Sequence, residues 1–412
     1  MTDTMTEAEF EAAFAAAQEL SEYFREIGPE CDTKNKFPRQ SIARFKKSGL
    51  VGLNTPKEYG GLGADLLQTS KIVSELSRGD SAITLAYNMH YIMVGMCLGL
   101  FSDAQKKEWL GRVGNDNEIV FGPFSEQRAG FSGLADMTAV PQPEGGWRLY
   151  GKKVWGTLSE AANIVTTNAT ITDAAGNLPD TFEERVEQES FFVAEFKLDR
   201  SLKGDGVRVE RTWDALGMHA TGTHTVHFEG LYVPEDGFVC EWRSGAFGVL
   251  EWASLMFASV YLGMQYRVLE ESRAVLAKKT LGATFGAVAA AETKVANVGH
   301  IIDGIGDMAS RAEISRRVLY RTCQEVAEGD DDNWPVELRF PYIGLAKTFI
   351  ADNVLHMTKH AMSMVGGSSF KKGAIFERLY RDSAASMFQP LNADQSRTFI
   401  GEQLLAPEEL ED

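Results

Sequence analysis

The chain is poor in cysteine and in positive charge. Its 412 residues contain four widely scattered cysteines and no Cys-x-x-Cys pair. Such spacing predicts reduced thiols in a cytoplasmic protein, with neither a disulfide framework nor a metal site. Lys and Arg total 41 against 58 Asp and Glu, a net charge of −17. This surface repels phosphate backbones and anionic lipid, so we expect neither nucleic acid nor a membrane as a partner.

Long apolar runs and targeting signals are scarce as well. No unbroken apolar run reaches the ~20 residues that a membrane helix needs. The first residues lack the basic stretch and apolar core of a secretory signal. The hydrophobic share of 44% and the charged share of 24% are those of a globular protein. A chain of this length usually forms two or three packed subdomains.

What the sequence does contain is a period of apolar residues that changes twice. Residues 1–118 show helical spacing, residues 119–237 show the alternation of strands, and helical spacing returns over 240–412. We therefore expect three domains with these boundaries. Within the second, the acidic segment 173–189 is interpreted as a solvated loop. In the third, helices are expected over 255–276, 287–328 and 341–365, the last capped by Gly366-Gly367.

Six short motifs occur in a fixed order along this pattern. They are Pro56 to Gly63, Phe124-Ser125-Glu126, Lys153 to Thr157, Leu216 to Thr223, Val226 to Pro234, and Lys278 to Gly282. Together they resemble the signatures of the acyl-CoA dehydrogenase superfamily over nearly the whole chain. The resemblance implies a mostly α fold with a central β domain: an N-terminal helical domain, a β-barrel-like middle domain and a C-terminal four-helix bundle.

The resemblance also implies an FAD site. In this superfamily the Trp-x-Thr strand lies against the flavin, which assigns Trp155 to cover the ring, Thr157 to donate near N5, and Ser125 to contact the pyrimidine edge. A strand aromatic and a strand β-branched residue are the structural alternative.

A neighbouring subunit would complete this site. Lys278, Thr280, Gly366 and Gly367 match the elements that reach the nucleotide from a second chain, which implies a homodimer or homotetramer. The glutamine that the family has in this region is replaced by Ala289. The alternative for the glycine pair is an ordinary helix cap.

The catalytic glutamate of the superfamily is missing from its expected place. Counting from Arg381-Asp382 to Arg397 without gaps places Pro390 there. Some relatives carry the base on the helix after the β domain, where this chain has Ala253 and Ser254. Glu251 is a candidate base two residues away, although it would point elsewhere around a helix. Its alternative role is an N-terminal helix charge.

His90 is the second candidate catalytic residue. It lies in Tyr87-Asn88-Met89-His90-Tyr91, on the helix that borders the substrate end of the flavin pocket in this superfamily. A histidine there could orient the substrate or transfer a proton. The alternative is a histidine hydrogen-bonded within a helical bundle.

Three functions remain open at this point. The first is an FAD-dependent oxidoreductase that oxidises an acyl thioester or a related carrier-tethered substrate by hydride transfer to flavin N5. The second is a flavin-dependent oxidase or monooxygenase that uses molecular oxygen. The third is a catalytically eroded binding or scaffold relative, suggested by Lys278 and Ala289. FAD in the purified protein would argue against a flavin-free scaffold, and oxygen consumption would separate the first two.

Overall fold

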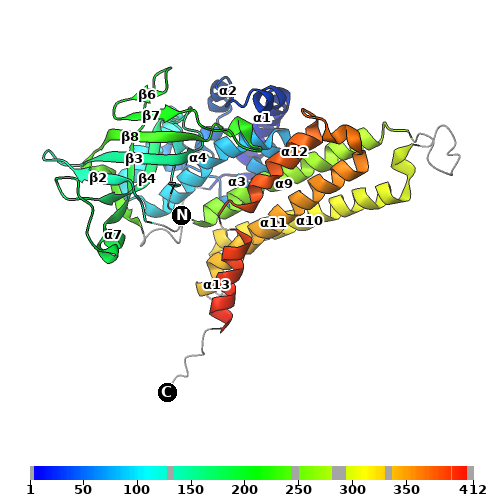
Figure 1. Ribbon diagram of the computed structural model, residues 1–412. Helices are drawn as coiled ribbons and strands as arrows, with labels where there is room; N and C mark the ends of the chain where they lie inside the picture. Colours follow the sequence, from blue (N-terminus) through cyan, green and yellow to red (C-terminus); the bar gives the residue numbers. More distant parts are fainter. Residues whose placement is uncertain are drawn as a thin grey trace.

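The computed structural model describes residues 4–127, 134–242, 250–280, 294–329, 336–390 and 392–405. Its elements lie in three sequential blocks, with the sheet at one end of the molecule and long helices at the other (Figure 1). The mostly helical fold with a central β region, as predicted, is confirmed. The strands run from Val120 to Glu241, between one helix that ends at Asp116 and another that begins at Leu250.

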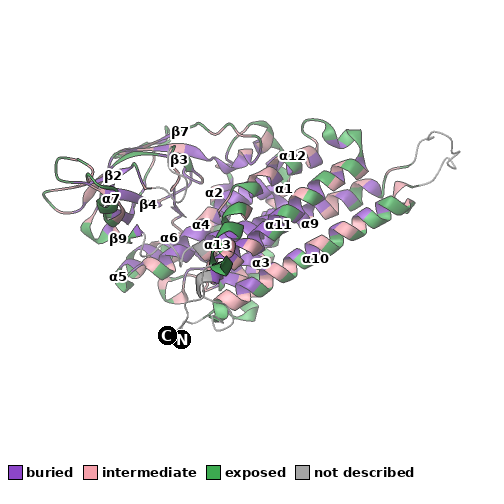
Figure 2. Ribbon diagram, turned by 60° about the horizontal axis from the view of Figure 1, so that its bottom comes forward, coloured by how far each residue is buried: buried purple, intermediate pink, exposed green. Residues whose placement is uncertain are grey.

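The first block is a helical layer around two buried helices. It contains α1 (Glu7–Thr33), α2 (Ser41–Lys47), α3 (Leu66–Gly79), α4 (Ser81–Leu100), the short α5 (Asp103–Gln105) and α6 (Gly111–Asp116). The Asp65 side chain caps α3, and the Asp80 side chain accepts from the Ile83 N–H to start α4. By length and composition α4 could cross a membrane, but most of it is buried inside this protein. It is a core helix, buried over most of its length (Figure 2).

The second block is a twisted nine-stranded sheet. Its order is β6 (Lys203–Gly204), β7 (Val207–Glu210), β8 (His224–Val233), β3 (Trp147–Gly156), β2 (Thr138–Pro141), β4 (Ile164–Ile171), β5 (Glu189–Glu195) and β9 (Phe238–Glu241). β1 (Val120–Phe121) pairs with β4 off this path. The β3–β8 ladder, which aligns Lys152 with His227, carries much of the site described below.

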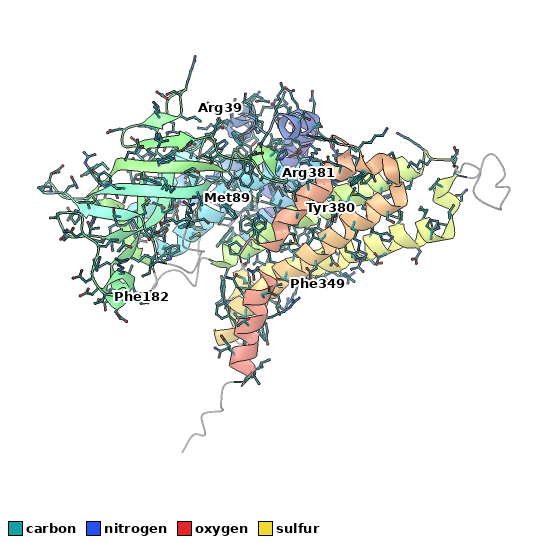
Figure 3. All side chains as sticks on the ribbon, in the orientation of Figure 1. Arg39, Met89, Phe182, Phe349, Tyr380 and Arg381 are labelled. Carbon is teal, nitrogen blue, oxygen red and sulfur yellow. The ribbon has the colours of Figure 1, made fainter. Side chains whose placement is uncertain are left out.

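One local prediction in this block is wrong. The segment 173–189 is not wholly a loop, because it contains helix α7 (Phe182–Gln188). Thr181 and Glu184 form a reciprocal capping box at its start, with the Thr181 hydroxyl accepting from the Glu184 N–H at 3.2 Å. The helix stands out from the sheet, and its Phe182 is exposed (Figure 3).

The third block contains the long helices α9 (Leu250–Leu276), α10 (Gly299–Glu328) and α11 (Val336–Val365), followed by α12 (Ile375–Ser383) and α13 (Ala393–Leu405). α9 and α11 begin earlier than predicted, and the described part of α10 begins later. α11 ends at Val365, and the following Gly366 has a φ of 80°, a positive backbone angle that glycine adopts freely.

Close helix contacts join the third block to the first. A side chain on Gly263 of α9 would clash with the backbone of Ser74 in α3, and one on Gly95 of α4 would clash with the Trp252 ring. Ser70 and Ser259 share a hydrogen bond of 2.7 Å across the same α3–α9 contact. These small residues let the helices approach closely, which fixes α4 and α9 as one continuous wall.

Candidate functional site

A cavity of about 940 Å³ opens where the sheet meets α4, α9 and the segment after α12. Met89 of α4 marks the place between sheet and helices (Figure 3). Its size suits a cofactor ring together with a small substrate. The residues that line it include Met89, Ser125, Trp155, Thr157, Ala253 and Pro390.

The sheet wall of the cavity is rich in hydroxyl groups. Thr157, directly after β3, shares a hydrogen bond of 2.9 Å with Thr223, which shares one of 2.7 Å with Thr221. The Thr221 hydroxyl donates to the Met218 carbonyl at 2.8 Å. Because the Thr221 proton is used in this bond, Thr223 donates to Thr221, and Thr157 in turn donates to Thr223. Thr157 then has no proton left to donate, and its hydroxyl oxygen can accept a hydrogen bond from a polar ligand.

Two predicted flavin residues flank this hydroxyl chain. Trp155 lines the cavity with 47% of its surface exposed, and its ring lies 5.6 Å from that of Phe388. A large apolar side chain left open in a cavity is typical of a surface that a ligand covers. Ser125 also lines the cavity, and its carbonyl accepts from the Val154 N–H at 2.8 Å. The structure thus brings Ser125, Trp155 and Thr157 into one site.

A buried ion pair holds the loop that carries Ser125. The Lys153 ammonium donates to Glu126 at 2.6 Å, to the Asn168 amide oxygen at 2.9 Å and to the Phe124 carbonyl at 3.3 Å. Burial lowers the pKa of Lys153, and the Glu126 carboxylate opposes that shift. Glu126 also accepts the Asp136 N–H at 2.7 Å, so its oxygens are already engaged. The pair is therefore a positioning device for the cavity wall.

The helix wall is apolar. It consists of one face of α4, with side chains spaced three or four residues apart, and the start of α9. These residues are Leu85, Met89, Ile92, Met93, Met96, Ala253 and Phe257. Methionines are adaptable surfaces for flat or irregular apolar groups. This wall can hold an apolar substrate.

The two positions at which the resemblance predicts a base lie in the lining of this same cavity. Pro390 and Ala253 line it, and neither carries a proton acceptor on its side chain. Lys347 fixes the segment that carries Pro390, because its ammonium donates hydrogen bonds of 2.7 Å to the carbonyls of Ser386 and Gln389. Burial lowers the pKa of Lys347 to about 8. The Tyr261 hydroxyl donates to the Gln389 side chain at 2.6 Å, so Pro390 sits on a firmly placed segment.

The Arg381-Asp382 pair attaches this end of the bundle to the β domain. Asp382 is buried and accepts the Met218 N–H at 2.5 Å, and Met218 lines the cavity. A side chain on Gly217 would clash with the Arg381 backbone. Arg381 itself pairs with Asp32 at 2.7 Å. Burial raises the pKa of Asp382 to about 7, with a further contribution from Asp80.

His90 does not line the cavity. It lies on α4, but its Nε2 is 2.8 Å from the Val51 carbonyl and its Nδ1 accepts the Val120 N–H at 3.0 Å. Since Nδ1 accepts, the ring is neutral and Nε2 is the donor. Burial lowers the pKa of His90 to about 4. The histidine therefore joins α4 to two backbone segments, as in the alternative of a hydrogen-bonded histidine, and lies outside the cavity lining.

Glu251 is also outside the cavity lining. Its carboxylate lies 3.1 Å from the guanidinium of Arg339 on α11. Positions 251 and 253 are about 200° apart around an α-helix. Because Ala253 lines the cavity, Glu251 is expected to point away from it. The structure therefore gives Glu251 an ion pair between α9 and α11, and gives no support to the candidate base.

The four residues expected to act from another subunit lie apart from the cavity. Lys278 and Thr280 follow α9, while Gly366 and Gly367 follow α11, and none of them lines the cavity. The two helix ends are joined because the Lys279 ammonium donates to the Val365 carbonyl. The chain thus carries two clusters of predicted cofactor residues, at different places. Ala289 lies outside the described residues.

A carboxylate–imidazole pair in the cavity was not predicted. Glu210 and His227 both line it, with 2.7 Å between Oε2 and Nε2. His227 is four residues beyond Thr223 along the strand, roughly 13 Å at ~3.3 Å per residue. His227 therefore lines a distal part of the cavity, at the end away from Thr157. The alternation along residues 225–227 places it on the cavity face, but the sequence does not show which face that is.

Known protein families match both helical blocks. The model of the acyl-CoA dehydrogenase N-terminal domain matches residues 6–116, and that of the C-terminal domain matches residues 255–392, together more than half of the chain. The chain belongs to the acyl-CoA dehydrogenase family. The predicted resemblance is confirmed.

Individual relatives of this acyl-CoA dehydrogenase family member are distant but nearly full-length. An acyl-CoA dehydrogenase of Bacillus subtilis is 25% identical, with 92% of this chain and 94% of the relative covered. An L-prolyl-[peptidyl-carrier protein] dehydrogenase of Pseudomonas fluorescens is 25% identical, with 89% and 90% covered. Among solved structures, the dibenzothiophene monooxygenase TdsC of Paenibacillus sp. A11-2 has a TM-score of 0.79 at 21% identity, with 95% and 97% covered. That last likeness shows the fold alone.

Proposed function

We propose that this acyl-CoA dehydrogenase family member is a flavin-dependent oxidoreductase that passes electrons to molecular oxygen and acts on an apolar substrate. The observation that carries the proposal is the composition of one cavity. Ser125, Trp155 and Thr157 line it together with Pro390 and Ala253. The residues assigned to the flavin line the cavity, and neither Pro390 nor Ala253 carries a carboxylate.

The residues present fit a flavin, and we propose FAD. Trp155 offers an exposed ring surface, while Thr157 and Ser125 offer hydroxyls toward the same space. Thr157 would lie at N5, Ser125 at the pyrimidine edge, and Trp155 against the ring. A bound flavin supplies two-electron transfer, which no protein side chain provides. The chain's own groups would fix its orientation and stabilise its charge.

The absence of a base argues against ordinary acyl-CoA dehydrogenation. That reaction removes an α-proton, and a positioned base is typically worth ~10²–10⁴ in rate. Among the described residues that line the cavity, the carboxylates are Glu126 and Glu210. Glu126 is engaged by Lys153 and by backbone N–H groups, and Glu210 pairs with His227 at the distal end. A flavin that is reduced by an external donor and then meets oxygen needs no α-proton acceptor.

An assembly of two or four copies would complete the site. Lys278, Thr280, Gly366 and Gly367 form a second cluster that does not line the cavity of their own chain. We propose that this cluster contacts the nucleotide end of FAD in a neighbouring copy. A monomer in solution that retains stoichiometric FAD would contradict this part of the proposal.

The test begins with the purified protein. Its flavin is released and identified, and the loaded protein is then mixed anaerobically with butyryl-CoA in single-turnover mode. We expect FAD, little bleaching by the thioester, and rapid reoxidation by oxygen after reduction with dithionite. Fast bleaching by butyryl-CoA, or reduced flavin that is stable in air, would overturn the proposed reaction. A protein without any flavin would support a scaffold role instead.

A second candidate is dehydrogenation of a carrier-tethered acyl group. The supporting observation is the L-prolyl-[peptidyl-carrier protein] dehydrogenase, which is 25% identical over most of both chains. Presenting prolyl and butyryl groups on a phosphopantetheinyl carrier protein distinguishes the two candidates. Bleaching by a carrier-bound group, but not by the CoA thioester, would favour this second function.

A further inference from the structure

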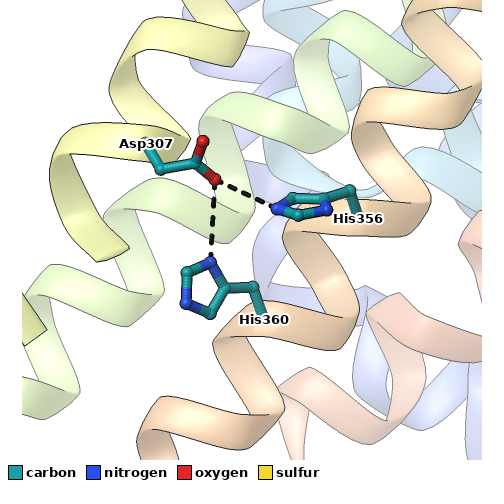
Figure 4. A group of neighbouring side chains, drawn as sticks. All are labelled: Asp307, His356 and His360. Atoms are coloured by element: carbon teal, nitrogen blue, oxygen red, sulfur yellow. Dashed lines mark hydrogen bonds and ion pairs between the residues drawn. The ribbon is translucent and has the colours of Figure 1, made fainter. Parts of the chain in front are cut away.

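Two histidines and one aspartate meet on the outside of the helical bundle, away from the cavity. His356 and His360 are one turn apart on α11, and Asp307 faces them from the first half of α10 (Figure 4). Both rings point toward the same carboxylate in the close-up (Figure 4). One ligand atom from each side chain lies within 4.8 Å of the other two.

The distances are close to those of a metal site. His356 Nε2 lies 3.0 Å and His360 Nδ1 lies 3.7 Å from Asp307 Oδ2. Ligands ~2.0–2.1 Å from a tetrahedral ion are a little over ~3 Å from one another, so small side-chain rotations suffice. The His360 Nδ1 atom is buried and makes no hydrogen bond among the described residues. A buried ring nitrogen aimed at a carboxylate is the feature that an ion would satisfy.

We propose that Asp307, His356 and His360 bind a divalent transition-metal ion, with Zn²⁺ as the probe of choice. Two imidazoles at positions i and i+4 of a helix present their nitrogens on one face, and a carboxylate completes a ligand set suited to zinc. A hollow of about 610 Å³ lies beside the three residues, bordered also by Asp303 and Ser310. The fourth position of the ion would open to it and hold water.

Arg311 is the built-in competitor of this ion. Its Nε donates to both Asp307 oxygens, at 2.9 and 3.0 Å, and its Nη1 donates to Asn353 at 3.0 Å. A cation beside the carboxylate opposes a second cation. The guanidinium must therefore turn away from Oδ2 when the ion binds. Replacing Arg311 with glutamine should tighten binding, an outcome that a purely ion-paired cluster would not give.

The site would link the two helices near the predicted nucleotide cluster. His360 precedes Gly366 by six residues, roughly 9 Å at ~1.5 Å per helical residue. A metal here would brace α10 against α11 close to that turn. Because the three side chains are 32–43% exposed, an ion can reach them without unfolding.

The experiment is a Zn²⁺ titration of the flavin-loaded, EDTA-treated protein by calorimetry, with the melting temperature measured in parallel. We expect one Zn²⁺ per chain and a melting temperature that rises with its concentration. His356→Ala and His360→Ala should each weaken binding by at least about tenfold, and the double variant should lose it. His300→Ala, at an exposed position near the start of α10, is the matched control.

The outcomes separate a site from chance binding. Unchanged Zn²⁺ binding in the double variant, or binding weakened equally by His300→Ala, would overturn the proposal. So would absence of Zn²⁺ binding to the parent protein at micromolar concentrations. Alanine suits an exposed helix position, and circular dichroism with flavin content verifies that the variants fold. Tighter binding in Arg311→Gln supports the assigned ligand set.

Discussion

The two walls of the cavity differ in what they carry. The sheet wall presents hydroxyls and an exposed indole, in Thr157, Thr223, Ser125 and Trp155. The helix wall presents apolar side chains, and the segment after α12 adds Pro390 to the same cavity. The residues that the resemblance assigns to the flavin thus lie on one wall, while the positions that it assigns to a base carry no carboxylate. The family fold is the shared part, and the reaction depends on a few facing residues.

The largest effect is expected from a carboxylate placed at position 390, in the lining of the cavity. Pro390→Glu should raise the rate of flavin reduction by butyryl-CoA by ~10²–10⁴, because a base would then face the same cavity as Thr157. The measurement is anaerobic stopped-flow bleaching of the flavin. Pro390→Gln, similar in size but without a base, is the control and should remain slow. Equal rates for the parent protein and the glutamate variant would show that Pro390 is not at the base position.

The next prediction removes the Thr157 hydroxyl from the sheet wall. Thr157→Val should slow the reductive half-reaction by ~10²–10³ and shift the flavin potential, since one preorganised hydroxyl near N5 is lost. Folding should change little. Thr212→Val is the control, because Thr212 also lines the cavity but belongs to a different pair of hydroxyls. The Thr212 hydroxyl shares a hydrogen bond of 2.9 Å with that of Thr225. A potential that stays constant in Thr157→Val would remove this residue from the flavin contact.

Much of this difference could be predicted from the sequence. The changes of apolar period give the order of helix, sheet and helix, and the family resemblance implies a flavin site at Trp155, Thr157 and Ser125, which the structure brings into one cavity with Ala253 and Pro390. Such motifs tie a residue to a strand end or a loop, whose direction the backbone fixes. The capping box Thr181-x-x-Glu184 was also readable, although α7 was missed.

The rest could not be predicted, for physical reasons. α4 is buried on every side, so its sequence has no polar face that would show which way His90 points. The Asp307 cluster joins positions 49 residues apart and depends on how α10 packs against α11. The sequence prediction of no metal site used ligand spacing within the chain, which cannot detect a ligand from a second helix.

His90 gives a stability prediction in place of a catalytic one. His90→Ala should lower the free energy of unfolding by about 2–4 kcal/mol, because it leaves a cavity and unpairs the Val51 carbonyl and the Val120 N–H. Turnover per bound flavin should be retained. The pKa near 4 in the folded protein is below the ordinary value of 6.5. The unfolded chain therefore binds more protons between these values, and the contribution of His90 is lost as the pH falls from 6.5 toward 4.

Urea unfolding between pH 4.5 and 7.5 measures this prediction. The deficit of His90→Ala should shrink toward low pH, because the variant lacks the titrating ring. His300→Ala, at an exposed position, is the control and should match the parent protein throughout. Full stability of His90→Ala with loss of turnover would instead restore the catalytic assignment.

The smallest expected effect concerns Asp382, which anchors the cavity residue Met218. Its pKa is raised to about 7 by burial and by Asp80, above the ordinary 3.8. Between pH 3.8 and 7 the folded protein holds a proton that the unfolded chain has released, so the free energy of unfolding falls across this window and the loss is complete above 7. Asp382→Asn is neutral and keeps an oxygen for the Met218 N–H. Since Arg378 offsets part of the charge, we expect the variant to be on the order of 1–2 kcal/mol more stable than the parent at pH 8 and equal to it at about pH 3, where the carboxyl is protonated in both states. Urea unfolding at both values measures it, and a variant that is less stable at pH 8 would show that the ionised carboxylate is required there.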